Sequence, residues 1–133
     1  MLSDQPKANK LVLLLSNLGM DKLRILGFAG SLRVGSYNRA LLRAATELLP
    51  DGTTLEIFDL NGIPPFNQDL EMNMFAKVKE FKSKIREADA ILIATPEYNY
   101  SVPGVLKNAI DSASRPYGDN PSSWSRLCGL LRP

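Results

Sequence analysis

The feature that most constrains this chain is a polar loop, residues 30–38, set between an apolar run and a helical pattern. The loop has the sequence G-S-L-R-V-G-S-Y-N, and the apolar run 23–29 before it is typical of a parallel strand buried on both faces. The helical pattern begins at Asn38. A helix N-terminus offers unpaired N–H groups and a partial positive charge. The loop is therefore suited to holding a phosphate group.

Two further strand–loop–helix units follow, and together they predict an α/β fold with a parallel sheet. Residues 53–60 and 90–94 are predicted strands. Apolar residues at helical spacing predict the buried faces of three helices: Leu41, Ala44, Ala45 and Leu48; Phe75, Val78, Phe81 and Ile85; Leu106, Ala109, Ile110 and Ala113. We expect the strand order 2-1-3, which makes the loops after the first and third strands neighbours at the point where such sheets bind ligands.

The composition excludes several classes of protein. The chain has 133 residues, a net charge of +2, one cysteine and no histidine. The lack of histidine removes His-based triads and most zinc sites, so we expect no metal. A lone cysteine forms no internal disulfide, which fits a reducing cytoplasm. The mild charge argues against a nucleic-acid partner, and no apolar run approaches the ~20 residues that span a bilayer.

The loop does not match the familiar nucleotide motifs. Gly30 and Gly35 have the spacing of a P-loop, but Ser36 stands where that motif needs a lysine. The glycine spacing also differs from the dinucleotide fingerprint. Hydroxyl, guanidinium and amide groups remain as phosphate ligands, from Ser31, Arg33, Ser36 and Asn38. The alternative is a polar connection without a ligand, in which Asn38 caps the helix.

The loop after the third strand adds a flat aromatic group. Pro96-Glu97-Tyr98-Asn99 supplies a rigid turn, an aromatic ring and hydrogen-bonding groups beside the same crevice. A planar heteroaromatic ligand with a phosphate tail would use both loops, and FMN matches this description. The alternative for Tyr98 and Tyr100 is packing at the surface or in an interface.

Three motifs resemble the NADPH-dependent FMN reductase family, the flavodoxin-like group that includes bacterial quinone, azo-dye and chromate reductases. They are G-S-L-R-V-G-S-Y-N at 30–38, I-P-P-F-N-Q-D-L-E at 63–71 and T-P-E-Y-N-Y-S-V-P-G-V-L-K-N-A-I-D at 95–111. The resemblance implies a five-stranded parallel sheet in the order 2-1-3-4-5 and usually a homodimer or homotetramer.

The same resemblance implies hydride transfer from NAD(P)H through bound FMN to a quinone, flavin, azo or metal-oxyanion acceptor. By this resemblance Ser31, Arg33, Ser36 and Asn38 would bind the FMN phosphate. Pro96, Glu97, Tyr98 and Asn99 would line the flavin ring, largely through backbone groups. The cofactor carries the chemistry, so no catalytic side chain is required.

The two ends of the chain depart from the family pattern. We expect residues 1–19 to be a leader without a role in the fold, with Met20 as the natural start and the flavodoxin-like domain over 20–121. Residues 122–133 show neither strand alternation nor a glycine-rich loop. We therefore expect a truncated fold that lacks the fourth and fifth strands, with the third strand at the edge of the sheet. The alternatives to the reductase are a flavodoxin-like electron carrier and an inactive fragment.

Overall fold

The computed structural model describes residues 22–116, 118 and 127–132. Its elements in chain order are β1 (Leu23–Ala29), α2 (Tyr37–Glu47), β2 (Thr53–Phe58), the 3₁₀ helix η1 (Gln68–Asn73), α3 (Ala76–Glu87), β3 (Ala90–Pro96), α4 (Gly104–Ala113) and β4 (Leu127–Arg132). The predicted leader and the position of Met20 lie outside the described residues. Of the described helices, none is long and apolar enough to cross a membrane.

The strands form one parallel sheet in the order β2-β1-β3-β4. The predicted order 2-1-3 is confirmed. β1 lies between β2 and β3, with Gly27 opposite both Ile57 and Leu92, and Ala29 opposite Ala94. Because the strands are parallel, the loops after β1 and β3 leave the same edge of the sheet.

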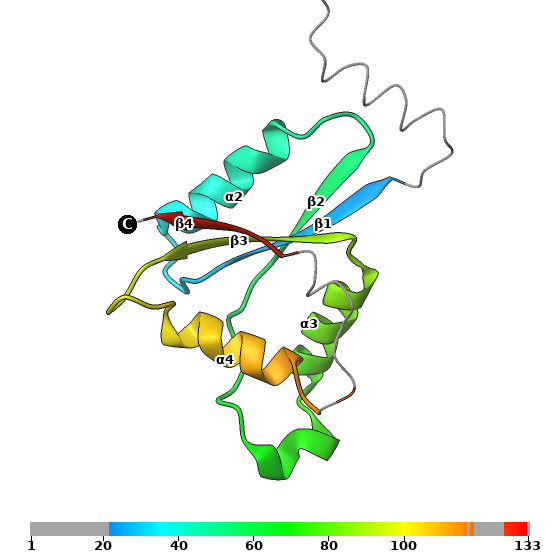
Figure 1. Cartoon of the computed structure of the whole chain (residues 1–133), viewed down its shortest axis with the longest axis vertical. Helices are drawn as coiled ribbons and strands as arrows, with labels where there is room; N and C mark the ends of the chain where they lie inside the picture. The colour runs from blue at the N-terminus through cyan, green and yellow to red at the C-terminus, as the bar shows by residue number, and fades with distance from the viewer. Residues whose placement is uncertain (1–21, 117, 119–126, 133) are drawn as a thin grey trace, which may run out of the picture.

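Helices cover both faces of the sheet, with α2 on one side and α3 and α4 on the other (Figure 1). Successive residues of a strand point to opposite faces, so each face receives every second side chain. Leu26 and Phe28 of β1 join the cluster that contains α3 and α4 residues. Ala29 instead packs with Leu42 of α2 and Ala94 of β3. These two apolar layers explain why β1 and β3 are almost uninterrupted apolar runs.

Phe81 of α3 is the centre of the larger layer. Its ring meets Phe28 edge-on at 5.1 Å between centroids and stacks on Phe58 at 5.0 Å. All three side chains are buried. Such aromatic pairs add about 0.5–1.5 kcal/mol each beyond the area they bury. The contacts attach α3 to β1 and β2 and so fix the carboxyl edge of the sheet.

The expectation that β3 is an edge strand is wrong. β4 pairs with β3 in parallel along its whole length, from Ile91 opposite Leu127 to Pro96 opposite Arg132. Without β4, the N–H and C=O groups on this side of β3 would be unpaired, and such groups form a template for another strand. The run L-C-G-L-L-R at 127–132 lacks the alternation on which the prediction relied, and the pairing of a parallel strand does not require alternation in the sequence.

The predicted start and buried face of α2 also need correction. The helix begins at Tyr37 with Ser36 as its N-cap, so Asn38 is not the cap. Leu42 is the fully buried residue, whereas Ala44 is exposed and Leu48 is 82% exposed. Leu48 is the C-cap, with φ −104° and ψ 4°, so its side chain leaves the helical stripe. The predicted stripe of α4 is confirmed, because Leu106, Ala109 and Ala113 are buried.

Candidate functional site

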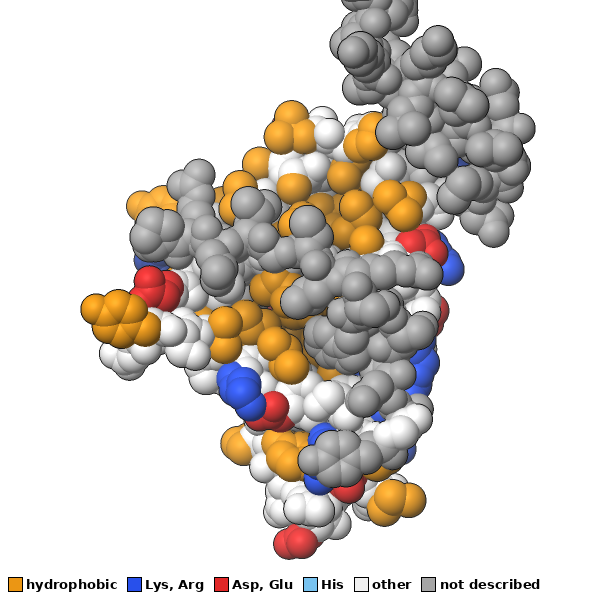
Figure 2. Space-filling view, viewed as in Figure 1, with side chains coloured by type: hydrophobic (Ala, Val, Ile, Leu, Met, Phe, Trp, Pro, Cys, Tyr) orange, Lys and Arg blue, Asp and Glu red, His pale blue; other side chains and the backbone are white. Residues whose placement is uncertain are grey.

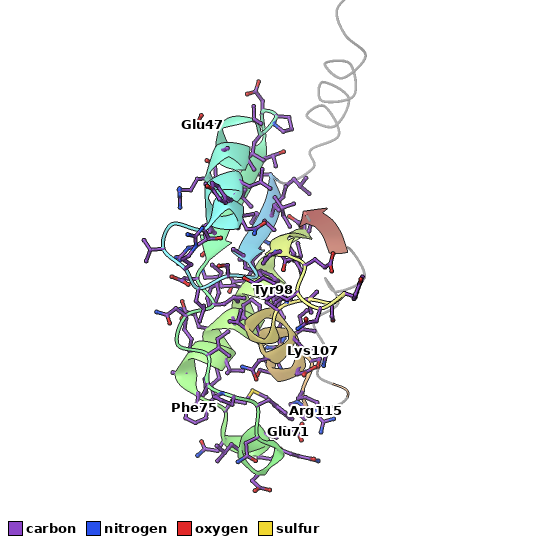
Figure 3. All side chains as sticks on the ribbon, turned by 90° about the vertical axis from the view of Figure 1, so that its left-hand side faces the viewer. Glu47, Glu71, Phe75, Tyr98, Lys107 and Arg115 are labelled. Carbon is purple, nitrogen blue, oxygen red and sulfur yellow. The ribbon has the colours of Figure 1, made fainter. Side chains whose placement is uncertain are left out.

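The loop after β1 begins in contact with the last residues of β3, at the carboxyl edge of the sheet. The Gly30 N–H donates to the Ala94 carbonyl oxygen at 2.8 Å. A Cβ atom on Gly30 would lie only 2.2 Å from Thr95 Oγ1 and 2.8 Å from Thr95 Cβ, closer than real atoms approach. Glycine is therefore required here by the close approach of β3. The predicted neighbourhood of the two loops is confirmed, at the side of the sheet that faces the viewer in Figure 3.

The loop after β1 ends in a side-chain cap on α2. Ser36 Oγ accepts a hydrogen bond from the Asn38 N–H at 3.2 Å, and Ser31 Oγ accepts from the Arg33 N–H at 3.3 Å. Ser36 is only 4% exposed, whereas Ser31 and Asn38 are half-buried. Each hydroxyl can still donate its own hydrogen to an acceptor. The loop thus presents donors at the positive end of a helix.

Arg33 and Arg39 lie close in sequence but differ in their partners. The Arg39 guanidinium is bound to Asp59 Oδ2 at 2.7 Å and also donates to the Leu32 carbonyl oxygen at 3.4 Å. Arg33 is exposed, and its guanidinium lies 5.9 Å from the centroid of the Tyr37 ring. Within the described part of the chain, Arg33 has no carboxylate partner. Its charge is therefore available to an anionic ligand, whereas that of Arg39 is engaged.

The Arg39–Asp59 pair ties the loop after β1 to the end of β2. The Asn61 N–H donates to Asp59 Oδ1 at 3.0 Å, and this bond lowers the pKa of the Asp59 carboxyl below its usual value. Partial burial opposes the effect, and the Arg39 guanidinium adds to it. The carboxylate form is thus favoured, which maintains the pair with Arg39.

The loop after β3 is a tight turn over residues 98–101. The Tyr98 N–H donates to the Ser101 carbonyl at 2.9 Å, and the Ser101 N–H donates back to the Tyr98 carbonyl at 3.0 Å. The central residues Asn99 and Tyr100 have φ angles of 51° and 60°. Positive φ at both central positions defines a type I′ turn. Within the loop, Glu97, Tyr98, Asn99 and Tyr100 are exposed and Pro96 is half-buried.

The structure therefore brings the two groups of predicted residues to one edge of the sheet. Ser31, Arg33, Ser36 and Asn38 form one side, and Pro96, Glu97, Tyr98 and Asn99 form the other. This is a phosphate-suited loop beside an aromatic turn, at the switch point of a parallel sheet.

The family model of the NADPH-dependent FMN reductases matches residues 23–130, which include β1 through most of β4. The chain belongs to this family. It is 55% identical over 97 residues to an NAD(P)H-dependent FMN reductase of Pseudomonas aeruginosa; the match covers 72% of this chain and 52% of the relative. It is 50% identical over 108 residues to an NAD(P)H:quinone oxidoreductase of Solanum tuberosum, over 77% of this chain and 54% of the relative.

A solved structure of similar fold is that of FerB, a flavoenzyme NAD(P)H:(acceptor) oxidoreductase from Paracoccus denitrificans. The two structures superpose with a TM-score of 0.72 at 36% identity, over 82% of this chain and 59% of FerB. The chain thus spans about half the length of the curated relatives it matches and somewhat more of FerB.

Two residues with specific contacts at the carboxyl ends of strands were not identified from the sequence: Thr95 beside the first site loop, and Asn108 beside the loop after β2. Buried Thr95 packs against Gly30, and Asn108 of α4 clamps the loop after β2. Asn108 Oδ1 accepts from the Phe66 N–H at 2.7 Å, and its Nδ2 donates to the Pro64 carbonyl at 2.9 Å. Each lies inside a motif that carries the family resemblance, but only the fold shows what it contacts.

A small, mainly apolar pocket lies between α4 and the I-P-P-F-N-Q-D-L-E motif, away from the two site loops. Pro64, Phe66, Leu70, Met74 and Phe75 form most of its wall. Arg115 Nε and Glu71 Oε1 lie 2.5 Å apart at its rim, with side chains 13% and 16% exposed (Figure 3). The motif thus packs against α4, and the residues that the two site loops present do not line this pocket.

Proposed function

We propose that this chain is the FMN-binding part of an NAD(P)H-dependent oxidoreductase. The observation that carries the proposal is the contact between Gly30 and Thr95, which brings a phosphate-suited loop beside an exposed aromatic turn. In a member of the NADPH-dependent FMN reductase family, this pair of loops suits a flavin mononucleotide.

The residues present fit the phosphate end of FMN. The loop 30–38 contains no carboxylate, and it joins hydroxyl and backbone donors to the N-terminus of α2. Arg33 supplies a guanidinium that can bind a phosphate in a bidentate manner. Asn38 and the two serines would donate the remaining hydrogen bonds.

The turn after β3 would hold the flavin ring. The Tyr98 N–H and C=O groups close the turn, so the backbone groups of Glu97 and Asn99 would face the ring, and the Tyr98 side chain offers a flat wall. Bound FMN would accept a hydride from NAD(P)H and pass its electrons to a second acceptor. The protein contributes binding and orientation, so no acid or base is needed at the site.

The acceptor, the assembly and the location belong to the proposal as well. The relatives include proteins named quinone reductase, which favours a quinone acceptor; free flavin, azo compounds and metal oxyanions such as chromate are the other candidates. We propose a homodimer or homotetramer for the whole protein, a cytoplasmic location, and neither nucleic acid nor membrane as a partner.

An anaerobic reduction assay tests the function. The purified chain is loaded with FMN, its visible spectrum is recorded, and NADPH or NADH is added. Rapid bleaching supports the reductase. Bound flavin that stays oxidised points to an electron carrier, and a chain that takes up no FMN contradicts the proposal.

An arginine pair tests the phosphate site separately. We expect Arg33→Ala to weaken FMN binding roughly 10- to 150-fold, because one charge-assisted contact is worth roughly 1.5–3 kcal/mol. Arg43→Ala removes the same charge from the exposed side of α2 and should leave the affinity unchanged. Equal affinities in both variants would remove Arg33 from the site.

A further inference from the structure

The turn after β3 stores backbone strain that its own side chains do not relieve. Asn99 tolerates the left-handed region, but a bulky residue such as Tyr100 at φ 60° is an outlier. The Tyr100 side chain is 100% exposed, so burial of its ring offsets none of that strain. Strained residues persist only where surrounding contacts hold them, and they are concentrated at functional sites.

The side chain that holds this backbone is Glu97. Its Oε1 accepts a hydrogen bond from the Tyr100 N–H at 3.0 Å. A carboxylate that accepts from a backbone N–H makes a stronger bond than a neutral acceptor. Within the described residues, Glu97 makes no ion pair, so its carboxylate has no competing cation.

We infer that Glu97 is a positioning residue: its carboxylate holds the 98–101 turn in the conformation that binds the ligand before the ligand arrives. The inference rests on the proposed function, because the turn matters to the reaction only if it lines the flavin. A loop ordered in advance loses less entropy on binding, which raises affinity. Glu97 would thus act through the Tyr100 backbone rather than through contact with the cofactor.

A double-mutant cycle distinguishes positioning from contact. FMN affinity is measured by quenching of flavin fluorescence for the wild type, Glu97→Ala, Tyr100→Gly and the double variant. With Tyr100 present, we expect Glu97→Ala to weaken binding about tenfold, near the lower limit for one lost charge-assisted bond. In the Tyr100→Gly background the loss should be much smaller, because glycine adopts the left-handed region without strain.

Two further variants complete the design. Glu97→Gln keeps a neutral acceptor oxygen and should bind FMN with an affinity between those of the wild type and Glu97→Ala. Glu47→Ala removes an equal charge at the far end of the molecule (Figure 3) and should change nothing. An equal loss in both backgrounds, or no rescue by glutamine, would overturn the inference and indicate direct contact or a general charge effect.

Hydrogen exchange in the ligand-free chain separates this inference from the proposed function. Glu97→Ala should speed exchange of the Tyr100 and Ser101 amides and leave the amides of β1 unchanged. Unchanged exchange at the turn would overturn the positioning role. If the wild type fails to bind FMN, the proposed function falls, and the exchange data still decide whether Glu97 holds the turn.

Discussion

The loops after β1 and β3 lie side by side but are held in place by different means. The first loop ends in a relaxed cap, in which Ser36 in extended backbone receives the Asn38 N–H. The second is a type I′ turn with two non-glycine residues at positive φ. The first presents charged and hydroxyl side chains, whereas the second presents backbone groups and exposed aromatic rings. A single site can thus combine polar side chains from an unstrained loop with backbone groups whose positions are set by a strained turn.

Both segments also expose apolar side chains at this edge. Leu32, Val34 and Tyr37 are exposed on and after the first loop, as are Tyr98 and Tyr100 on the second. Figure 2 shows hydrophobic side chains gathered toward the middle of one face of the molecule, with charged side chains mainly along its margins.

The largest expected effect comes from breaking the contact between the first loop and the end of β3. Gly30→Ala places a Cβ atom 2.2 Å from Thr95 Oγ1, so the first loop must move away from β3. We expect a loss of about 1–3 kcal/mol in the free energy of unfolding, measured by urea denaturation. Gly35→Ala is the matched control, since no atom lies within 4 Å of its Cβ, and its effect should stay within about 0.5 kcal/mol. Equal losses in the two variants would contradict a specific contact at Gly30.

The next effect tests whether the first loop depends on its cap. Ser36→Ala leaves the Asn38 N–H without its acceptor, and we expect a loss of about 1 kcal/mol in denaturant unfolding. Ser83→Ala, which removes an exposed hydroxyl from α3, should cost less than about 0.5 kcal/mol. A cost at Ser36 no larger than at Ser83 would show that the cap does not stabilise α2.

The second loop should respond in the opposite direction. Tyr100→Gly removes the side chain from a left-handed position and creates the sequence that type I′ turns favour. We expect the free energy of unfolding to rise by about 0.5–1 kcal/mol, because relief of the left-handed strain, roughly 1–2 kcal/mol, is partly offset by the greater backbone entropy that glycine loses on folding. The midpoint of urea denaturation measures the change. A destabilised variant would mean that the tyrosine ring stabilises the chain and that the comparison of the two loops is wrong.

The smallest effect concerns the ion pair that supports the first loop. Because the folded pKa of Asp59 lies below its usual value, its contribution to stability is present above that value and is lost as the pH falls through the folded pKa. Asp59 is partly exposed, so we expect Asp59→Asn to cost only a few tenths of a kcal/mol near pH 7.

Stability measured from pH 7 to pH 2 checks this expectation. The difference between the wild type and Asp59→Asn should shrink below about pH 4. Asp51→Asn, in the exposed turn before β2, controls for the loss of one negative charge. A difference that stays constant with pH would show that the charge of Asp59 is not what ties the loop to β2.

Much of the architecture could be predicted because local signals agreed with the global fold. β1 and β3 are uninterrupted apolar runs, and each is followed by a polar loop and an amphipathic pattern, which leaves few possible topologies. The prediction failed where local signals were ambiguous. The sequence of β4 lacks an alternation of apolar and polar residues, although the segment pairs with β3. Leu48 has the spacing of the apolar face of α2, although the helix ends at Glu47.

The candidate site shows the same division. The sequence alone identified the candidate binding residues, because hydroxyl, guanidinium and aromatic groups are identifiable by type and the loops by their neighbouring strands. Tertiary structure alone decided how those groups are used: that Ser36 caps the helix, that Arg39 is engaged while Arg33 is available, and that Glu97 holds the Tyr100 backbone. The physical reason is that partners such as Gly30 and Thr95 are 65 positions apart, and only the pairing of β1 with β3 brings them into contact.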